Sequence, residues 1–238
     1  MKFTYSIPTK ILFGPGSFND LATTPLPGKK ALIVITAGKS MRANGYLDRL
    51  IAMLDKQGIG HALFDKILPN PVLRHVHEGA ALAREQGCDF VIGLGGGSSI
   101  DSAKSIAVMA KNPGDYWDYI SGGSGKGQPL VNGALPIVAI ATTAGTGTEA
   151  DPWTVITKED TNEKIGFGCA ETFPVLSVVD PEMMLTIPAH LTAYQGFDAL
   201  FHATEGYIAN VATPLSDAYA LKSIELLAKY LPAAVKDG

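Results

Sequence analysis

The chain has 238 residues and a formal net charge of −4, with 19 Lys and Arg against 23 Asp and Glu residues. Hydrophobic residues make up 46% and charged residues 18%, which argues against disorder and against a basic nucleic-acid-binding surface. Cys88 and Cys169 have no metal-ligand or CxxC spacing and suit a reducing compartment, so we expect a cytoplasmic protein. Apolar segments fall short of the roughly 18 residues of a membrane span, so we expect no membrane association.

Strand and helix patterns alternate along most of the chain. In chain order we expect a strand at 30–35, helices at 45–56 and 72–86, a strand at 89–94, a helix at 100–110 and a strand at 135–140. The strand segments are continuous apolar runs, which are typical of parallel strands covered on both faces. This alternation predicts βαβ units and an α/β, Rossmann-like domain with a parallel sheet.

The pattern changes towards the C-terminus. Beyond Pro188 only helices are predicted, at 192–206 and 216–230. We therefore expect a dinucleotide-binding α/β domain over 1–182 and the first helices of an all-helical domain over 183–238. Two or three helices form a poor core by themselves, so we expect the helical domain to be truncated in this chain.

A glycine-rich turn from Gly95 to Ser98 links a buried strand to the start of a helix. Free N–H groups at such a helix start attract phosphate, and glycines allow close approach of the ligand. A plain tight turn is the alternative for a glycine run alone, but the strand–turn–helix context favours phosphate. The G-x-G-x-x-G spacing is not met, and Gly38-Lys39-Ser40 is not a Walker A motif because Ile33 replaces the required glycine.

A second small, polar loop, 142–149, also follows a buried strand. Ligands of open parallel sheets bind at the carboxyl ends of strands, so the two loops together indicate one nucleotide crevice. If each threonine of this loop is considered singly, a hydroxyl that caps a helix or stabilises a turn is a simpler role than ligand binding.

Asp198 and His202 lie four residues apart in a predicted helix. Side chains at this spacing share a helix face, so both can reach one cation. The alternative is a hydrogen bond between the two side chains on the helix surface. His75 and His77 fall on different faces of their helix, and we expect both at the surface.

Six short motifs follow one another along the sequence: FGPGSF at 13–18, PNP at 69–71, GLGGGSSIDSAK at 93–104, TTAGTGTE at 142–149, DPE at 180–182 and GFDALFHATEGY at 196–207. Because these six motifs occur together and in this order, the chain resembles the iron-containing (group III) alcohol dehydrogenases of the dehydroquinate-synthase-like superfamily. The resemblance extends over essentially the whole sequence.

The resemblance implies an oxidoreductase that uses NAD or NADP and a divalent metal, usually Fe²⁺ and sometimes Zn²⁺. The residues implied to bind the pyrophosphate are Gly96, Gly97, Ser98 and Ser99, and those implied to contact the rest of the cofactor are Asn70, Thr142, Thr143 and Lys164. It also implies that Asp198 and His202 supply two of four metal ligands, the others being histidines further downstream. The metal would act as a Lewis acid on the substrate oxygen during hydride transfer to the nicotinamide.

Two departures from the family pattern affect these expectations. No histidine follows His202 in this sequence, so we expect the two remaining ligands that the resemblance implies beyond residue 238. In addition, Thr36-Ala37-Gly38-Lys39 replaces the segment in which many members have an Asp after the first strand. Smaller departures are Thr148 for the more usual Ser, and Asp151-Pro152-Trp153.

The function that these patterns indicate is a metal-dependent alcohol dehydrogenase or aldehyde reductase acting on a small alcohol or diol, as a homodimer or larger homo-oligomer. A glycerol dehydrogenase-like enzyme is the rival within the superfamily, and a lyase of the dehydroquinate synthase kind matches the segments less well. The alternative from another class is a nucleotide-binding module that is inactive as truncated.

Overall fold

The computed structural model describes residues 1–237, which divide into two compact units. One unit, here the sheet unit, contains residues 7–142 and 148–180. The other, here the helical unit, contains residues 1–6, 143–147 and those from 181 onward. Each unit is described by itself.

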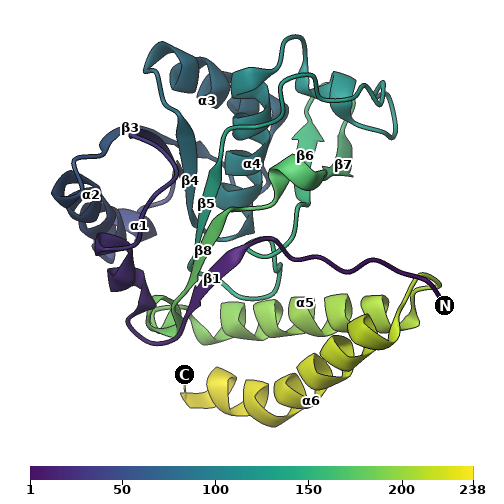
Figure 1. Cartoon of the computed structure of the whole chain (residues 1–238). Coiled ribbons are helices and arrows are strands. Elements are labelled where there is room, and N and C mark those ends of the chain that lie inside the picture. The colour runs from purple at the N-terminus through teal and green to yellow at the C-terminus, as the bar shows by residue number, and fades with distance from the viewer. Residues whose placement is uncertain (238) are drawn as a thin grey trace. The chain divides into compact units, whose positions relative to one another are not determined.

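The sheet unit is built on a parallel sheet, which has six strands in the described residues and the order β1-β8-β5-β4-β2-β3 (Figure 1). The strands are β1 (Lys10–Phe13), β2 (Lys30–Thr36), β3 (Gly60–Ile67), β4 (Phe90–Gly95), β5 (Ile137–Ala141) and β8 (Leu176–Val179). Strands β4 and β5 are buried along their whole length and β2 along its central five residues. This double-sided burial explains their continuous apolar sequences.

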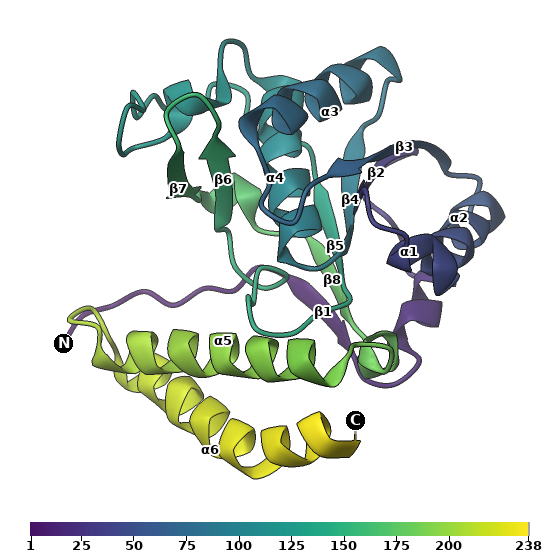
Figure 2. The same cartoon turned by 180° about the vertical axis from the view of Figure 1, so that it is seen from behind.

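Helices cover both faces of this sheet. The helices are α1 (Ser40–Ala43), α2 (Tyr46–Lys56), α3 (Leu73–Glu85) and α4 (Gly97–Lys111), with short 3-10 helices η1 (Ser17–Ala22), η2 (Tyr116–Tyr119) and η3 (Ala170–Thr172). Helices α3 and α4 lie on one face, and α1 and α2 lie on the other (Figures 1 and 2). A separate antiparallel hairpin is formed by β6 (Thr154–Lys158) and β7 (Glu163–Phe167).

Helix α4 packs closely on β4 and on α3, and a glycine in each of these two elements makes the approach feasible. A Cβ atom on Gly93 would lie 2.9 Å from the Cα atom of Ile100, and one on Gly79 of α3 would lie 2.4 Å from the side chain of Ile106. Any larger residue at these positions would push α4 away from its neighbours. The first turn of α4 is therefore held firmly at the carboxyl end of β4.

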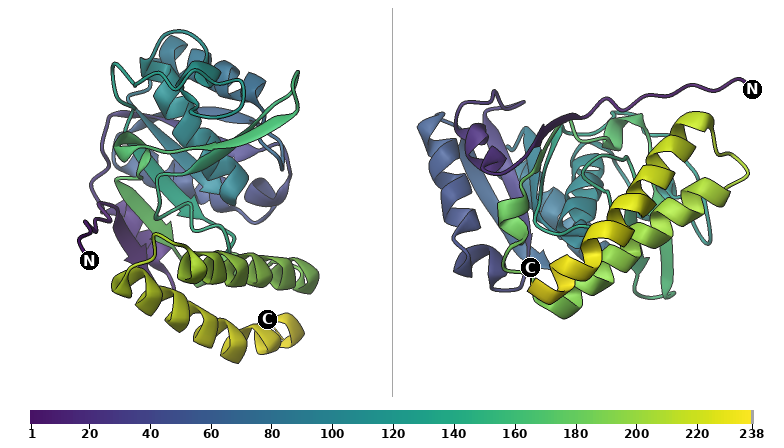
Figure 3. Two further views of the ribbon diagram at one scale, coloured as in Figure 1. Left: turned by 90° about the vertical axis from the view of Figure 1, so that its right-hand side faces the viewer. Right: turned by 90° about the horizontal axis from the view of Figure 1, so that it is seen from below.

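The helical unit consists mainly of η4 (Pro181–Met184), α5 (Ala189–Ile208) and α6 (Pro214–Asp237). Helices α5 and α6 lie side by side (Figure 3), and a Cβ atom on Gly196 would meet the side chain of Leu231. Large apolar side chains on these helices remain exposed, among them Tyr194, Phe197, Phe201, Tyr219 and Tyr230. In the described part of the chain, no helix is both long enough and apolar enough to cross a membrane.

The predicted α/β class with a parallel sheet is confirmed, as is the run of helices at the C-terminal end. Strands β1, β3 and β8 and the β6–β7 hairpin were not predicted, because short or partly exposed strands lack a continuous apolar run. Helix α6 also continues through Pro232 beyond its predicted end. The surface expectation for His75 is wrong: the residue is only 6% exposed, because it packs edge-on against Phe64 of the neighbouring strand.

Candidate nucleotide and metal sites

The turn between β4 and α4 leaves the start of α4 open to a ligand. Gly95 has φ +144°, and a Cβ atom there would lie 2.6 Å from the Ser99 hydroxyl, so only glycine fits. Gly96 is the N-cap of α4 in extended conformation, and within residues 1–237 no side chain caps this helix. The first N–H groups of the helix, at Gly97 and Ser98, are therefore placed to bind an anion.

Other residues expected at the cofactor lie around this turn. The Ser98 hydroxyl donates to the carbonyl oxygen of Pro69, and Lys164 Nζ donates to Asn70 Oδ1 over 3.2 Å. The backbone N–H of Thr142 donates to the Gly95 carbonyl over 3.0 Å. Asn70 follows β3, Ser98 follows β4 and Thr142 follows β5, so these contacts gather at the carboxyl ends of parallel strands.

Thr143 is the one expected cofactor residue that the structure does not group with the sheet unit. It begins the segment 143–147, which belongs to the helical unit, whereas Thr142 belongs to the sheet unit. The remaining expected residues all lie in the sheet unit, so the structure brings together all of the expected nucleotide residues except Thr143.

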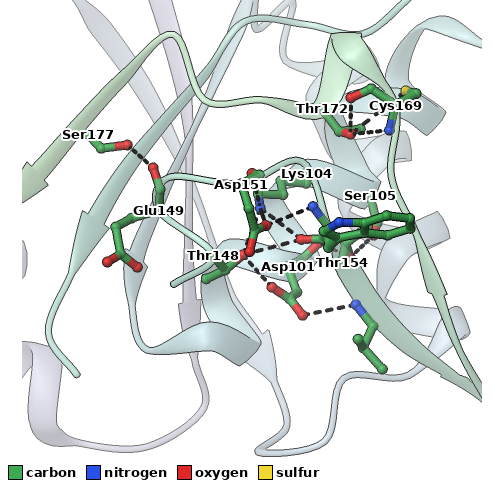
Figure 4. A network of polar contacts seen from close by, with 12 residues as sticks. Asp101, Lys104, Ser105, Thr148, Glu149, Asp151, Thr154, Cys169, Thr172 and Ser177 are labelled. Atoms are coloured by element: carbon green, nitrogen blue, oxygen red, sulfur yellow. Dashed lines mark hydrogen bonds and ion pairs between the residues drawn. The ribbon is translucent and has the colours of Figure 1, made fainter. Parts of the chain in front are cut away.

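Helix α4 also carries a buried ammonium group, that of Lys104, which lies within a network of polar contacts (Figure 4). The side chain of Lys104 is fully buried, and its Nζ atom donates to Thr148 Oγ1 at 2.7 Å, to the Trp153 carbonyl at 2.8 Å and to Asp151. The Asp151 contacts are to the carbonyl at 2.8 Å and to Oδ1 at 3.2 Å. Burial lowers the pKa of Lys104, and the carboxylates of Asp151 and Asp101 counter that shift.

Asp101 completes this network from the same helix. Its Oδ1 atom accepts from the Thr148 hydroxyl at 2.7 Å, and its Oδ2 atom accepts from the Val155 N–H at 2.9 Å. Burial raises the pKa of Asp101, against the opposing effect of these two hydrogen bonds and of Lys104. This network was not predicted from the sequence. One sequence signal could have revealed it: Lys104 stands four residues after Ile100 and three before Ala107, so a charged residue lies on the apolar stripe of its helix.

Asp180 joins two further segments of the family pattern. Its carboxylate accepts from the Gly16 N–H at 3.2 Å and from the Phe18 N–H at 3.0 Å. The side chain is buried at the end of β8, and it fixes the loop that starts η1. This contact explains structurally why an aspartate stands at the end of the sheet unit.

Asp198 and His202 share one face of α5 in the helical unit, as their spacing predicted. His202 Nδ1 lies 3.6 Å from Asp198 Oδ1 and 3.1 Å from the Gly145 carbonyl oxygen. Both side chains are about half exposed. A Cβ atom on Gly145 would lie 2.8 Å from Asp198 Oδ2, so this glycine (φ +103°) lets the 143–147 segment pass close to α5.

One carboxylate and one imidazole suit Fe²⁺ or Zn²⁺ chemically, but they make half of a coordination shell. Among residues 1–237, no three His, Cys, Asp or Glu side chains are grouped so that they could hold a metal ion. The residues present therefore fit two positions of a metal site. The side-chain pairing of Asp198 with His202 also matches the simpler alternative of a helix-surface pair.

The segment after β2 carries no acidic side chain near its end. The N–H of Ala37 donates to the Ile67 carbonyl oxygen, and Lys39 is the N-cap residue of α1. Both side chains are exposed, and in the described residues no carboxylate forms an ion pair with Lys39. Lys39 is thus available to an anionic ligand.

The parallel sheet with helices on both faces, followed by a helical region, places the chain among the Rossmann-like α/β proteins with an appended helical unit. Residues 8–181 match the sequence model "iron-containing alcohol dehydrogenase", and residues 192–238 match "Fe-containing alcohol dehydrogenase family, C-terminal". The chain belongs to the iron-containing alcohol dehydrogenase family, which confirms the resemblance found in its motifs.

Similar proteins include several dehydrogenases. The chain is 40% identical over 99% of its length to a choline dehydrogenase of Bacillus subtilis and 38% identical over 98% to an NAD-dependent methanol dehydrogenase of Bacillus methanolicus. It is also similar to the crystal structure of a sulfoacetaldehyde reductase from Bifidobacterium kashiwanohense in complex with NAD⁺, with a TM-score of 0.88 and 31% identity over 100% of the chain. The chain covers 58%, 60% and 61% of these three proteins, respectively.

Proposed function

We propose that this chain binds NAD or NADP and forms the nucleotide-binding part of a metal-dependent alcohol dehydrogenase or aldehyde reductase. The observation that carries the proposal is the uncapped start of α4 behind the Gly95 turn, with Asn70 and Lys164 grouped beside it. Membership of the family supports it, as do relatives described as NAD-dependent or in complex with NAD⁺.

Different residues of the chain would bind different parts of the nucleotide. The N–H groups of Gly97 and Ser98 would bind the pyrophosphate, because they point out of the helix start and carry its partial positive charge. Lys164 would add a positive charge next to Asn70, which can donate and accept hydrogen bonds to a ribose or amide. Thr142, held on Gly95, would place its hydroxyl at the same edge of the sheet.

Asp198 and His202 would hold Fe²⁺ or Zn²⁺ together with donors from outside residues 1–237. The chemistry that these groups would supply when bound is hydride exchange with the substrate carbon at the nicotinamide and polarisation of the substrate oxygen at the metal. Asp198 would contribute a negative charge to that site, and His202 would bind through a neutral ring nitrogen. The substrate class we propose is a small alcohol, diol or aldehyde, in keeping with the relatives' names.

A second candidate is a nucleotide-binding module without turnover. The grouping of only two metal-binding side chains in the described residues favours it for this chain taken alone. Metal content separates the two functions, since a dehydrogenase of this kind needs about one metal ion per subunit. We also propose a cytoplasmic homo-oligomer, and the free thiols of Cys88 and Cys169 support the reducing compartment.

The experiment that tests the proposal is a screen of small alcohols and aldehydes with both NAD(H) and NADP(H), run with added Fe²⁺ or Zn²⁺. The chain should bind nucleotide in every case. Turnover is expected only when donors additional to Asp198 and His202 complete the metal site, as in a longer protein that contains this chain. A chain that binds neither nucleotide contradicts the proposal, and nucleotide binding without turnover in a metal-loaded longer protein favours the second candidate.

A further inference from the structure

The buried network around Lys104 joins two elements that the nucleotide site needs. Helix α4 carries the proposed pyrophosphate site at its first turn, and the β6–β7 hairpin carries Lys164. Helix α4 packs on the six-stranded sheet, whereas β6 and β7 form a two-stranded sheet of their own, which an isolated parallel bridge between Val72 and Thr157 links to the segment after β3.

The segment that leads into and starts the hairpin, residues 148–155, is hydrogen-bonded to α4 through Thr148, Asp151, Trp153, Thr154 and Val155. Lys104 binds Thr148, Asp151 and Trp153, and Asp101 binds Thr148 and Val155 (Figure 4). An ammonium group has three donors, and here its protons are shared among four oxygen atoms.

The direction in which the Thr148 hydroxyl donates its proton follows from its two partners, Asp101 and Lys104. A carboxylate accepts only, so the Thr148 proton points to Asp101, and its lone pair accepts from Lys104. Each member of the trio therefore needs the other two. Removing one leaves a buried charge or a buried donor without its partner.

Asp151 is one of the positions at which this chain departs from the family pattern. Its carboxylate contributes a second negative charge to Lys104, and its Oδ1 atom also accepts from the Trp153 N–H at 2.8 Å. The departure thus has a structural role, because it tightens the turn that precedes β6.

We propose that Lys104 is a positioning residue of the nucleotide site: its ammonium group locks residues 148–155 onto α4 and so holds the hairpin, with Lys164, next to Asn70 and Ser98. The inference rests on the proposed nucleotide-binding function. Lys104 itself is fully buried and contacts protein oxygens, so it acts through Lys164 and not on the nucleotide.

NADH titration of purified variants, followed by fluorescence, tests this role. Lys104→Met should raise the Kd at least fivefold, and Thr148→Val, which removes only the hydroxyl, at least threefold. Thr148→Ser keeps the hydroxyl and should stay within twofold of the wild type. Lys111→Met is the matched control, because it removes a lysine from the same helix at an exposed position.

A double-mutant cycle with Lys164→Met distinguishes positioning from general destabilisation. If Lys104 acts through Lys164, then Lys104→Met should change the Kd less than twofold in the Lys164→Met background. Equal effects in both backgrounds, or a folded Lys104→Met protein with an unchanged Kd, would overturn the proposal. If Lys104→Met does not fold, an unchanged Kd in folded Thr148→Val overturns it instead. A wild-type chain that binds neither NADH nor NADPH contradicts the proposed function itself.

Discussion

Lys164 Nζ lies 3.2 Å from Asn70 Oδ1, which joins two residues 94 positions apart in the sequence. Asn70 follows β3, and Lys164 belongs to β7 of the separate hairpin. Both side chains are exposed, so the pair contributes little to folding stability. The backbone N–H of Thr157, which pairs with Lys164 in the hairpin, donates to the Pro71 carbonyl over 2.9 Å and so brings Lys164 beside Asn70. The nucleotide proposed above would give this exposed pair a ligand in common.

Replacing this lysine should weaken nucleotide binding and leave the fold intact. Lys164→Met should raise the Kd for NADH about fivefold, since an exposed lysine that pairs with an anionic ligand contributes up to about 1 kcal/mol. Isothermal titration calorimetry at low salt measures the change. Lys158→Met, on the partner strand β6, controls for the loss of one positive charge from the hairpin. Equal losses in the two variants would contradict a specific role for Lys164.

Cofactor choice should be relaxed or favour NADP(H). An aspartate after β2 would repel a 2′-phosphate and bind the 2′-hydroxyl, but this chain has Ala37 there with exposed Lys39 nearby. Ala37→Asp should shift the ratio of Kd values at least tenfold towards NADH. Ala37→Asn has nearly the same size without the charge and should shift it less. A wild-type preference of a hundredfold for NADH would contradict this expectation.

The buried His75 should make the sheet unit less stable in mild acid. Burial lowers its pKa below the ordinary value of about 6.5, with a further lowering by Arg74, and in the described chain its Nδ1 atom has no hydrogen-bond partner. The unfolded chain therefore takes up the proton first as the pH falls, so this contribution to stability is lost below about pH 6.5. Glu78 and Glu159 oppose the shift without reversing it, and Lys66 reinforces it.

Urea unfolding at pH 7.5 and at pH 5.5 measures this effect. His75→Phe should reduce the loss of unfolding free energy between the two pH values, because the aromatic contact with Phe64 is kept and the titrating group is removed. His77→Phe serves as the control, since His77 is partly exposed and pairs with Asp115. Identical pH dependence in the wild type and His75→Phe would rule out His75 as the source.

Asp198 and His202 should bind a divalent metal ion only weakly in this chain, and this binding should not depend on the nucleotide. Two donors leave a divalent ion mostly hydrated, so we expect poor retention of Zn²⁺ or Fe²⁺ during gel filtration. His202→Ala should abolish what binding there is, yet change the Kd for NADH less than twofold, because most expected nucleotide residues belong to the other compact unit. Metal binding that survives His202→Ala would leave Asp198 and His202 as a helix-surface pair.

Sequence patterns predicted the buried strands β2, β4 and β5, but not the four-residue strand β8, which is also buried. The runs that became β2, β4 and β5 are apolar without interruption because helices cover both faces. The edge strands β1 and β3 alternate only partly, and the hairpin is short, so periodicity alone did not distinguish them from loops.

The candidate site was predicted through local motifs, and its long-range contacts were not. The turn at Gly95 follows from a strand, glycines and a helix in sequence, but nothing local tells that Lys104 meets Asp151 or that Lys164 meets Asn70. Those pairs depend on how the hairpin folds back over α4. His75 was misplaced for the same reason, because its burial depends on Phe64 from another element.

The most direct test of a nucleotide site at the start of α4 is the affinity of Gly97→Val for NADH. Gly97 is the first residue of α4 and has helical backbone geometry, so a side chain there causes no backbone strain and the variant should fold. The branched side chain would occupy the space in which phosphate reaches the N–H groups. Calorimetric titration of the wild type and the variant, with thermal unfolding as the control for folding, should show the Kd rising tenfold or more, about 1.4 kcal/mol. An unchanged Kd in a folded Gly97→Val protein would contradict the account.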